Sequence, residues 1–249
     1  MIWNVREDRL LVISDIHLGN LFFNTSGLLF RFLEYAAREN YNLCINGDGL
    51  DIVQTSLIKM TKELSAAFDY LGRLVRGEAR IYYVIGNHDI ILEHFIEDFQ
   101  HIHLAPFLNV TSGDKRIRVE HGHLYDPFFA RHPDLYFAVT RLAGLALRIH
   151  PSLYHVHTFN RRVRATVNRA FRRGDGGGQN SSNEPRCFRQ AARELSRRGF
   201  DAVVLGHTHL HGMEELEGGG TYYNTGSWFK QPHYVKIEQG DIELLPWKG

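Results

Sequence analysis

The sequence lacks the features of a membrane-spanning or secreted protein. A spanning helix needs about 20 consecutive apolar residues, and the 249 residues contain no such run. The chain starts with the charged stretch NVREDR instead of a basic segment and an apolar block, so we expect no secretion signal. Only two cysteines occur, Cys44 and Cys187, without CxxC spacing, and we expect free thiols in a reducing compartment, the cytoplasm.

Lysine is absent from residues 127–198, and this absence marks a segment of unusual charge. Fourteen arginines and four acidic residues give this range a balance of +10, whereas the rest of the chain carries −9. The asymmetry favours an anionic partner for the basic segment, although helices with solvated arginines would have the same composition. No nucleic-acid module or aromatic stacking motif accompanies the arginines, so we expect no nucleic-acid partner.

Outside the basic segment, short apolar runs alternate with helical patterns. Strands are predicted at 10–14, 41–46, 80–86, 115–120 and 200–206, and helices at 28–39 and 56–76. The pattern of the C-terminal residues 222–247 predicts a series of short strands. This alternation predicts an α/β core.

Between residues 126 and 200 the pattern becomes helical. Three helices are predicted at 128–150, 155–173 and 186–198, with a glycine-rich polar loop at 174–185. We interpret 127–199 as a helical insertion, or lid, within a single domain that covers 1–249.

Five predicted strands end in polar residues of similar chemistry. The motifs are SDIHLG, NGDGLD, GNHD, EHGH and GHTH, and they supply Asp15, His17, Asp48, Asn87, His88, His121, His207 and His209. Sites in open α/β sheets lie beyond the carboxyl ends of the strands, so these groups are expected to converge. Residues two apart in an extended chain point the same way, which explains the spacing in D-x-H and H-x-H.

Carboxylates, imidazoles and an amide oxygen suit divalent metals such as Mn, Fe, Zn or Co. Without His88, the set contains seven candidate ligands. Seven are too many for one tetrahedral ion, but they suit two ions that share a carboxylate. Two ions about 4 Å apart form a clamp for in-line displacement at phosphorus. Gly86 would permit the turn that places Asn87 as a neutral oxygen ligand.

The ordered set D-x-H, GD, GNH[DE], H and GHxH resembles the pattern of the calcineurin-like metallophosphoesterase family. The resemblance covers about 10–126 and 200–249, and it implies a four-layer α/β/β/α sandwich that hydrolyses phosphoesters at a two-metal centre. The implied ligands of the first metal are Asp15, His17 and His209. Those of the second are Asn87, His121 and His207, with Asp48 bridging. Mn²⁺ is the expected metal, with Fe or Zn as alternatives.

The same resemblance suggests roles beside the metals. His88 matches the family's catalytic histidine, which protonates the leaving oxygen or stabilises developing charge. Asp89, predicted with it as part of the catalytic loop, would orient His88 or brace the loop. Asp51 would brace Asp48 or His17, or cap a helix start. His123 would support the ligands from behind or contact the substrate.

Three further motifs are interpreted as structural. HIH at 101–103 and HVH at 155–157 imitate ligand spacing, but one lies in an ordinary strand or loop region and the other in the basic insertion. The stretch YYNTGSW at 222–228 resembles the family's terminal turn, which packs under the site.

Within the family, the insertion resembles that of the UDP-diacylglucosamine diphosphatases of lipid A synthesis. NRRVRATVNRAFRR followed by a polar loop is similar in placement and character. LYFAVTRLAGLALRI combines an apolar face with arginines, which is typical of a helix that lines an acyl pocket or lies on a membrane, or that packs on a neighbouring helix. The sequence departs from those enzymes, which carry arginine at the position of His88 and aspartate at that of His123.

We therefore predict a two-metal phosphoesterase or pyrophosphatase. Its expected partner is a phosphorylated small molecule or lipid, such as a lipid-linked or nucleotide-sugar diphosphate, with contact to the inner face of a membrane through 128–173. The alternatives are a general phosphatase or nucleotide phosphodiesterase of the same fold, with the insertion as a dimer surface, and a non-catalytic metal-binding scaffold.

Overall fold

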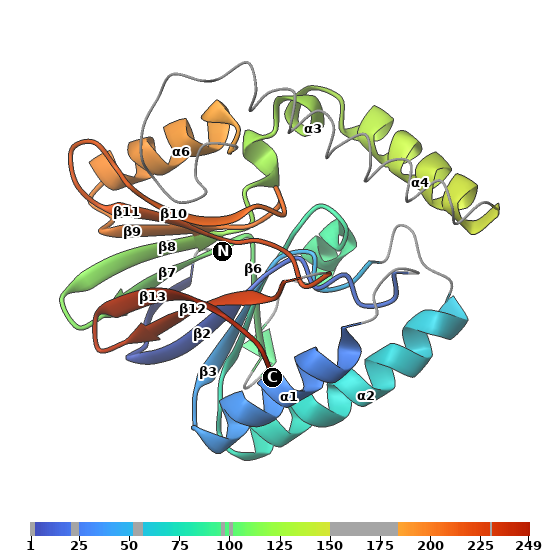
Figure 1. Cartoon of the computed structure of the whole chain (residues 1–249), viewed down its shortest axis with the longest axis horizontal. Coiled ribbons are helices and arrows are strands. Elements are labelled where there is room, and N and C mark those ends of the chain that lie inside the picture. Colours follow the sequence, from blue (N-terminus) through green and yellow to red (C-terminus); the bar gives the residue numbers. More distant parts are fainter. Residues whose placement is uncertain are drawn as a thin grey trace.

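The computed structural model describes residues 3–20, 25–51, 57–95, 98–99, 102–149, 184–229 and 231–249. These ranges form two β-sheets with helices on their outer faces (Figure 1). No helix within them combines the length and apolar character needed to cross a bilayer.

The larger sheet has seven strands in the order β13-β12-β2-β3-β4-β6-β5. Its four central strands are parallel: β2 (Arg9–Ile13), β3 (Asn42–Asn46), β4 (Ile81–Val84) and β6 (Ile102–Ala105). Helices α1 (Ser26–Arg38) and α2 (Leu57–Arg76) lie between β2, β3 and β4 along the chain, and η1 (Ile90–Phe95) follows β4. The antiparallel edges are β5 (Asp98–Phe99), β12 (His233–Glu238) and β13 (Asp241–Pro246).

The second sheet has six strands in the order β1-β7-β8-β9-β11-β10. Their bounds are β1 (Trp3–Arg6), β7 (Phe107–Ser112), β8 (Lys115–Glu120), β9 (Ala202–Leu205), β10 (His211–Glu215) and β11 (Thr221–Thr225). β8, β9 and β11 are parallel, so their carboxyl ends lie at one edge.

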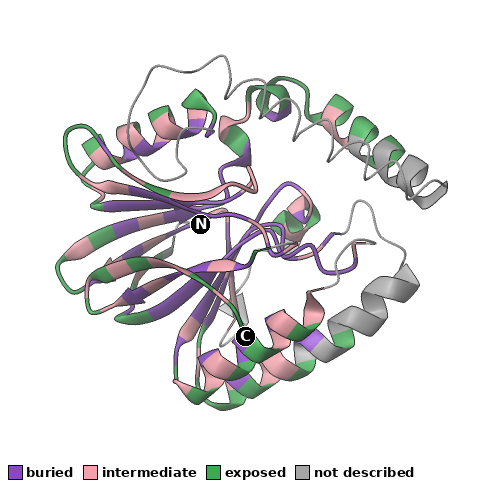
Figure 2. Cartoon of the chain, in the orientation of Figure 1, coloured by how far each residue is buried: buried purple, intermediate pink, exposed green. Residues whose placement is uncertain are grey.

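Alternation along β2 explains why this sheet is covered on both faces. Leu10 and Val12 belong to the apolar cluster between the sheets, together with residues such as Val204. Leu11 and Ile13 point the opposite way, into the cluster that packs on α1 and α2. Figure 2 shows the buried strands between the more exposed helices.

Helix α6 (Arg186–Arg197) provides the fourth layer. Phe188, Ala192 and Leu195 lie on one face of this helix and pack against Val203 and Leu205 on the outer face of the six-stranded sheet. The predicted four-layer α/β/β/α sandwich is therefore confirmed, with α6 as the helical layer on the six-stranded sheet.

The other described part of the insertion follows the short turn η2 (His123–Tyr125) and comprises α3 (Pro127–Arg131) and α4 (Pro133–Ile149). The single helix predicted at 128–150 is interrupted at His132, whose φ of −140° is not helical. Pro133 causes the break, because proline disfavours the helical conformation of the preceding residue. The helix predicted at 155–173 and most of the loop at 174–185 lie outside the described residues. The insertion limits of 127–199 stay a prediction.

Candidate metal centre

The loops that follow β2, β3, β4, β8 and β9 bring the predicted ligands together at one rim of the sandwich. Left-handed backbone angles are needed there, with φ between 51° and 69°, at Asp15, His17, Asp48, His207 and His209. Such angles are uncommon in residues other than glycine and cluster at functional sites. These turns direct side chains from loops of both sheets toward one another.

The first group consists of Asp15, His17 and His209, whose ligand atoms lie within 4.8 Å of one another. The Nε2 atoms of His17 and His209 are 3.2 Å apart, and Asp15 Oδ1 is 3.2 Å from His209 Nε2. Asp15 Oδ1 is buried and accepts no hydrogen bond. Burial favours the neutral carboxyl, but His209 and His121 outweigh it and lower the pKa of Asp15 to about 2.

The second group consists of Asp48, Asn87, His121 and His207. His121 Nδ1 lies 2.9 Å from the Asn46 carbonyl oxygen, which can only accept, so the Nδ1 proton is donated there. In a neutral ring, the lone pair of His121 Nε2 would then face Asn87 Oδ1 at 3.2 Å and Asp48 Oδ2 at 3.3 Å. Three acceptors in contact need a positive charge between them.

The charges around His121 favour a cation at the same place. Burial opposes a charge on His121, but Asp48 and Asp15 outweigh it and raise the pKa of His121 to about 10. A proton on Nε2 would satisfy the surrounding acceptors, and a divalent cation would satisfy them as well. The residues present thus fit the two divalent ions that the sequence predicts.

Asp48 lies between the two groups. Its Oδ2 is 3.3 Å from His121 Nε2 and 3.9 Å from His17 Nε2, one nitrogen from each group. Its Oδ1 accepts a hydrogen bond from the His88 backbone N–H at 2.8 Å. The arrangement fits the predicted bridging position.

Gly86 makes this position of Asp48 sterically possible. A Cβ atom added to Gly86 would lie 2.2 Å from Asp48 Oδ1 and 2.5 Å from the Asp48 backbone nitrogen. Any side chain at this position would therefore collide with Asp48, so the glycine permits the close approach of two loops. Gly86 has no positive φ, so its backbone angle does not require glycine.

His88 lies beside the first group with its ring held by Asp51. Its Nδ1 is 3.1 Å from Asp51 Oδ1, and the ring meets His17 edge-on with centroids 4.7 Å apart. The side chain is 12% exposed, so a ligand at the rim can reach it. Burial opposes protonation, but Asp48 and Asp51 raise the pKa of His88 to about 9. Asp51 thus supports His88, whereas the sequence analysis expected it to brace Asp48 or His17; its Oδ2 lies 3.9 Å from His17 Nδ1. The capping alternative concerns residues 52–56, outside the described ranges.

Asp89 is directed away from the space between the ligands. Its carboxylate accepts hydrogen bonds from the backbone N–H groups of Gly49, Leu50 and Gly86 and from the Tyr83 hydroxyl. Burial, reinforced by the charge of Asp48, raises the pKa of Asp89 to about 6. These contacts fit the bracing alternative of the sequence analysis, because Asp89 ties the loop after β4 to the loop after β3.

His123 lies behind the second group. It is 7% exposed, its ring centroid is 5.6 Å from that of His121, and its edge packs on Phe129. Burial lowers the pKa of His123 to about 3. Its position fits the prediction of a supporting residue.

The motifs interpreted as structural lie away from the ligand atoms where they are described. His103 is in β6 and stacks on Tyr82, while His101 and the HVH at 155–157 lie outside the described residues. Trp228 is fully buried under the centre, and its backbone N–H lies 3.3 Å from the Asp15 carbonyl oxygen.

Sequence reasoning missed two contacts, one from the residue that precedes the insertion and one from α4 within it. Asp126 Oδ2 lies 3.2 Å from His207 Nε2, and the Tyr136 hydroxyl accepts a hydrogen bond from Asn87 Nδ2 at 3.1 Å. Asp126 precedes Pro127 and caps α3, so its sequence signal was that of a helix start. Tyr136 carries no sequence signal of its own.

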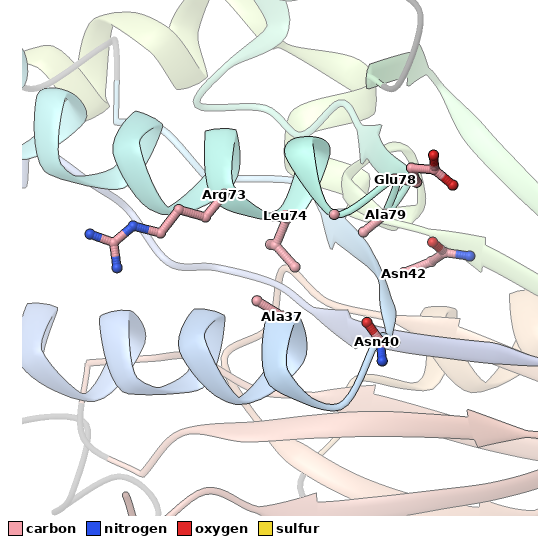
Figure 3. Close-up of a pocket in the computed structure, with 8 residues that line it drawn as sticks. Ala37, Asn40, Asn42, Arg73, Leu74, Glu78 and Ala79 are labelled. Atoms are coloured by element: carbon pink, nitrogen blue, oxygen red, sulfur yellow. The ribbon is translucent and has the colours of Figure 1, made fainter.

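A separate small pocket lies where α1 and α2 end, beside the first residue of β3 (Figure 3). Its volume is about 100 Å³, and its lining comprises Ala37, Asn40, Asn42, Arg73, Leu74, Gly77, Glu78 and Ala79. None of the predicted site residues lines it. It opens at the amino ends of the parallel strands, whereas the ligands follow their carboxyl ends.

Solved structures with similar folds include three from different organisms. They are a predicted phosphoesterase from Streptococcus pneumoniae (13% identity, 96% of this chain and 98% of that chain covered, TM-score 0.41), Vps29 complexed with zinc from Entamoeba histolytica (14%, 96% and 97%, 0.42) and a dimetal phosphatase from Danio rerio (12%, 96% and 95%, 0.47). A search of curated proteins gave no match.

The sequence profile described as calcineurin-like phosphoesterase matches residues 8–211. This range includes every predicted ligand, from Asp15 to His209, five strands of the seven-stranded sheet and three of the six-stranded sheet. The chain belongs to the calcineurin-like phosphoesterase family.

Proposed function

We propose that the chain hydrolyses phosphoester or diphosphate bonds with two bound divalent metal ions. One observation carries the proposal: oxygen and nitrogen atoms of carboxylate, amide and imidazole groups from five loops lie close together at the rim, most of them buried. Asp15, His17 and His209 would hold one ion, Asn87, His121 and His207 the other, and Asp48 both. The ions would polarise the phosphoryl group and lower the pKa of water, with Mn²⁺ the expected metal.

His88 is the candidate general acid for the leaving oxygen. Asp51 accepts at His88 Nδ1, which leaves Nε2 as the nitrogen that can deliver a proton. The ring is partly exposed beside the ligand groups, so it can reach a leaving group at the rim. Asp89 would act on this step through the loop that it braces.

We propose an amphipathic substrate, such as a lipid-linked or nucleotide-sugar diphosphate of the UDP-2,3-diacylglucosamine type. The support is α4, where Leu135, Val139 and Leu142 form an exposed apolar stripe at helical spacing. Arg131 and Arg141 are exposed on the same insertion and could bind phosphate groups. The same surface would contact the inner face of a membrane.

A second candidate is a general phosphatase or nucleotide phosphodiesterase. Its support is His88, which stands where the acylated-sugar diphosphatases carry arginine. Turnover of UDP-2,3-diacylglucosamine, its deacylated form, cyclic nucleotides and phosphomonoesters would distinguish the candidates. Leu142→Ser is expected to raise KM for the acylated substrate only; equal rates with and without acyl chains would exclude the lipid proposal.

Hydrolysis itself is tested with Mn²⁺ and bis(p-nitrophenyl) phosphate or p-nitrophenyl phosphate. Asp48→Ala and His121→Ala are expected to abolish turnover, whereas His103→Gln, which changes a histidine outside the centre, should retain it. Full activity in either of the first two variants would refute the ligand assignment. A chelator should stop the wild-type reaction, and added Mn²⁺ should restore it.

A further inference from the structure

Two hydrogen bonds connect the segment from Asp126 through α4 to the metal centre, and both reach ligands of the same proposed ion. Asp126, at the start of α3, contacts His207, and Tyr136, on α4, contacts Asn87. In Figure 1, α3 and α4 lie beyond the rim where the loops of the two sheets meet. Among the described residues, no hydrogen bond from α3 or α4 reaches Asp15, His17 or His209.

Each oxygen of Asp126 has its own donor. Oδ1 accepts the Phe128 backbone N–H at 2.9 Å and thereby caps α3. Oδ2, 3.2 Å from His207 Nε2, accepts the proton of that nitrogen. This bond fixes the tautomer of His207, so that the lone pair on Nδ1 faces Asn87 Oδ1 at 2.8 Å.

Tyr136 orients the side-chain amide of Asn87 in a similar way. Its hydroxyl oxygen accepts a proton from Asn87 Nδ2, so the amide oxygen turns toward His121 and His207. Without this acceptor the amide could rotate, and an N–H group would then face the two imidazoles. His207 Nδ1 and Asn87 Oδ1 would thus be free to bind a metal ion, because Asp126 and Tyr136 accept hydrogen bonds from the other polar atom of each side chain.

We propose that Asp126, which caps α3, and Tyr136, on α4, are positioning residues that set the affinity of the second metal ion alone. The inference rests on the two-metal function proposed above. Hydrogen bonds from carboxylates to ligating histidines commonly contribute 10- to 100-fold to metal affinity. The first ion, whose ligands are supported by the sandwich itself, should be unaffected.

Asp126→Asn gives the sharpest test because an amide has one acceptor and one donor. If its oxygen caps α3, its NH₂ group faces His207 and forces the proton onto Nδ1, toward the metal. If its oxygen accepts from His207, the cap on α3 is lost. Tyr136→Phe removes only the hydroxyl and tests the second contact separately. Asp134→Asn makes the same charge change in the exposed first turn of α4 and serves as the matched control.

Metal-free protein would be titrated with Mn²⁺, with bound metal measured by mass spectrometry and pairing of the ions by electron paramagnetic resonance. Wild type and Asp134→Asn should bind two ions with a spin-coupled signal. Asp126→Asn should bind the second ion about 10- to 100-fold more weakly and show the signal of a single Mn²⁺ at intermediate concentrations. Tyr136→Phe should weaken the same ion.

Equal affinities of Asp126→Asn and wild type for both ions would overturn the inference, and so would equal weakening of both ions. Thermal unfolding of the metal-free proteins identifies a variant that has lost its fold, in which case Tyr136→Phe decides. Wild-type protein that binds fewer than two ions would overturn the proposed function and this inference together.

Discussion

Replacement of Gly86 by alanine tests how the loops after β3 and β4 position Asp48, the proposed bridging ligand. The new Cβ would lie 2.2 Å from Asp48 Oδ1 and 2.5 Å from the Asp48 backbone nitrogen, against 3.4–4 Å for ordinary contact. A side-chain oxygen can rotate away, but a backbone nitrogen moves only with its loop. The loop after β3 must therefore shift by roughly 1 Å.

The size of the effect follows from this shift. Overpacking of this kind costs about 1–3 kcal/mol in folding free energy, which for a chain of this length lowers Tm by roughly 2–12 °C. A catalytic group misplaced by about 1 Å can reduce turnover about 100-fold. We therefore expect Gly86→Ala to remain folded and to lose activity out of proportion to its stability.

Gly72→Ala is the matched control, because it makes the same change within α2. Its Cβ would meet only the flexible Arg76 guanidinium, at 3.4 Å, and alanine is favoured over glycine in a helix by about 1 kcal/mol. Thermal unfolding, Mn²⁺ titration and phosphodiester turnover would be compared for the three proteins. A Gly86→Ala enzyme with wild-type turnover and metal affinity would refute the reasoning.

Three further substitutions test individual groups. His88→Ala should reduce kcat by about 10²- to 10⁴-fold with metal content unchanged, by assay and mass spectrometry, if His88 is the general acid. Asp89→Asn should lower stability in urea by about 1–3 kcal/mol, because its amide would face N–H donors; an unchanged midpoint would exclude bracing. Glu184 is 6% exposed, and burial raises its pKa from 4.5 to about 7. Because the folded state binds this proton more tightly, the protein should lose up to about 3 kcal/mol of stability from pH 4.5 to 7; Glu184→Gln should lack that loss, and a parallel pH dependence would refute the assignment.

Local patterns sufficed for much of the fold. β2 shows why: its residues are apolar on both faces, as expected for a strand buried between two layers. β1 and β10 were missed because WNVR and HGMEE are short and partly polar, and their strand conformation comes from pairing with β7 and β11. Pro133 itself indicates a helix break at His132, but the helical periodicity on both sides led to the prediction of one continuous helix.

The site could be predicted as far as its residues belong to ordered motifs. The sequence places Asp48 and Asn87 at strand ends, and in the structure both side chains contact His121 Nε2. Contacts between separate segments could not be predicted from the sequence. Asp51 with His88 and Tyr136 with Asn87 depend on how loops and helices approach in space, which no local pattern encodes.

The origin of the ligands in both sheets has a mechanical consequence. Asp48 and Asn87 follow strands of the seven-stranded sheet, while His121 and His207 follow strands of the six-stranded sheet. A cation held by all four would cross-link the halves of the sandwich at one margin, much as a disulfide joins two segments. Loading with metal should then make separation of the sheets at that margin harder, and the affinity for the ion would become part of the cohesion of the fold.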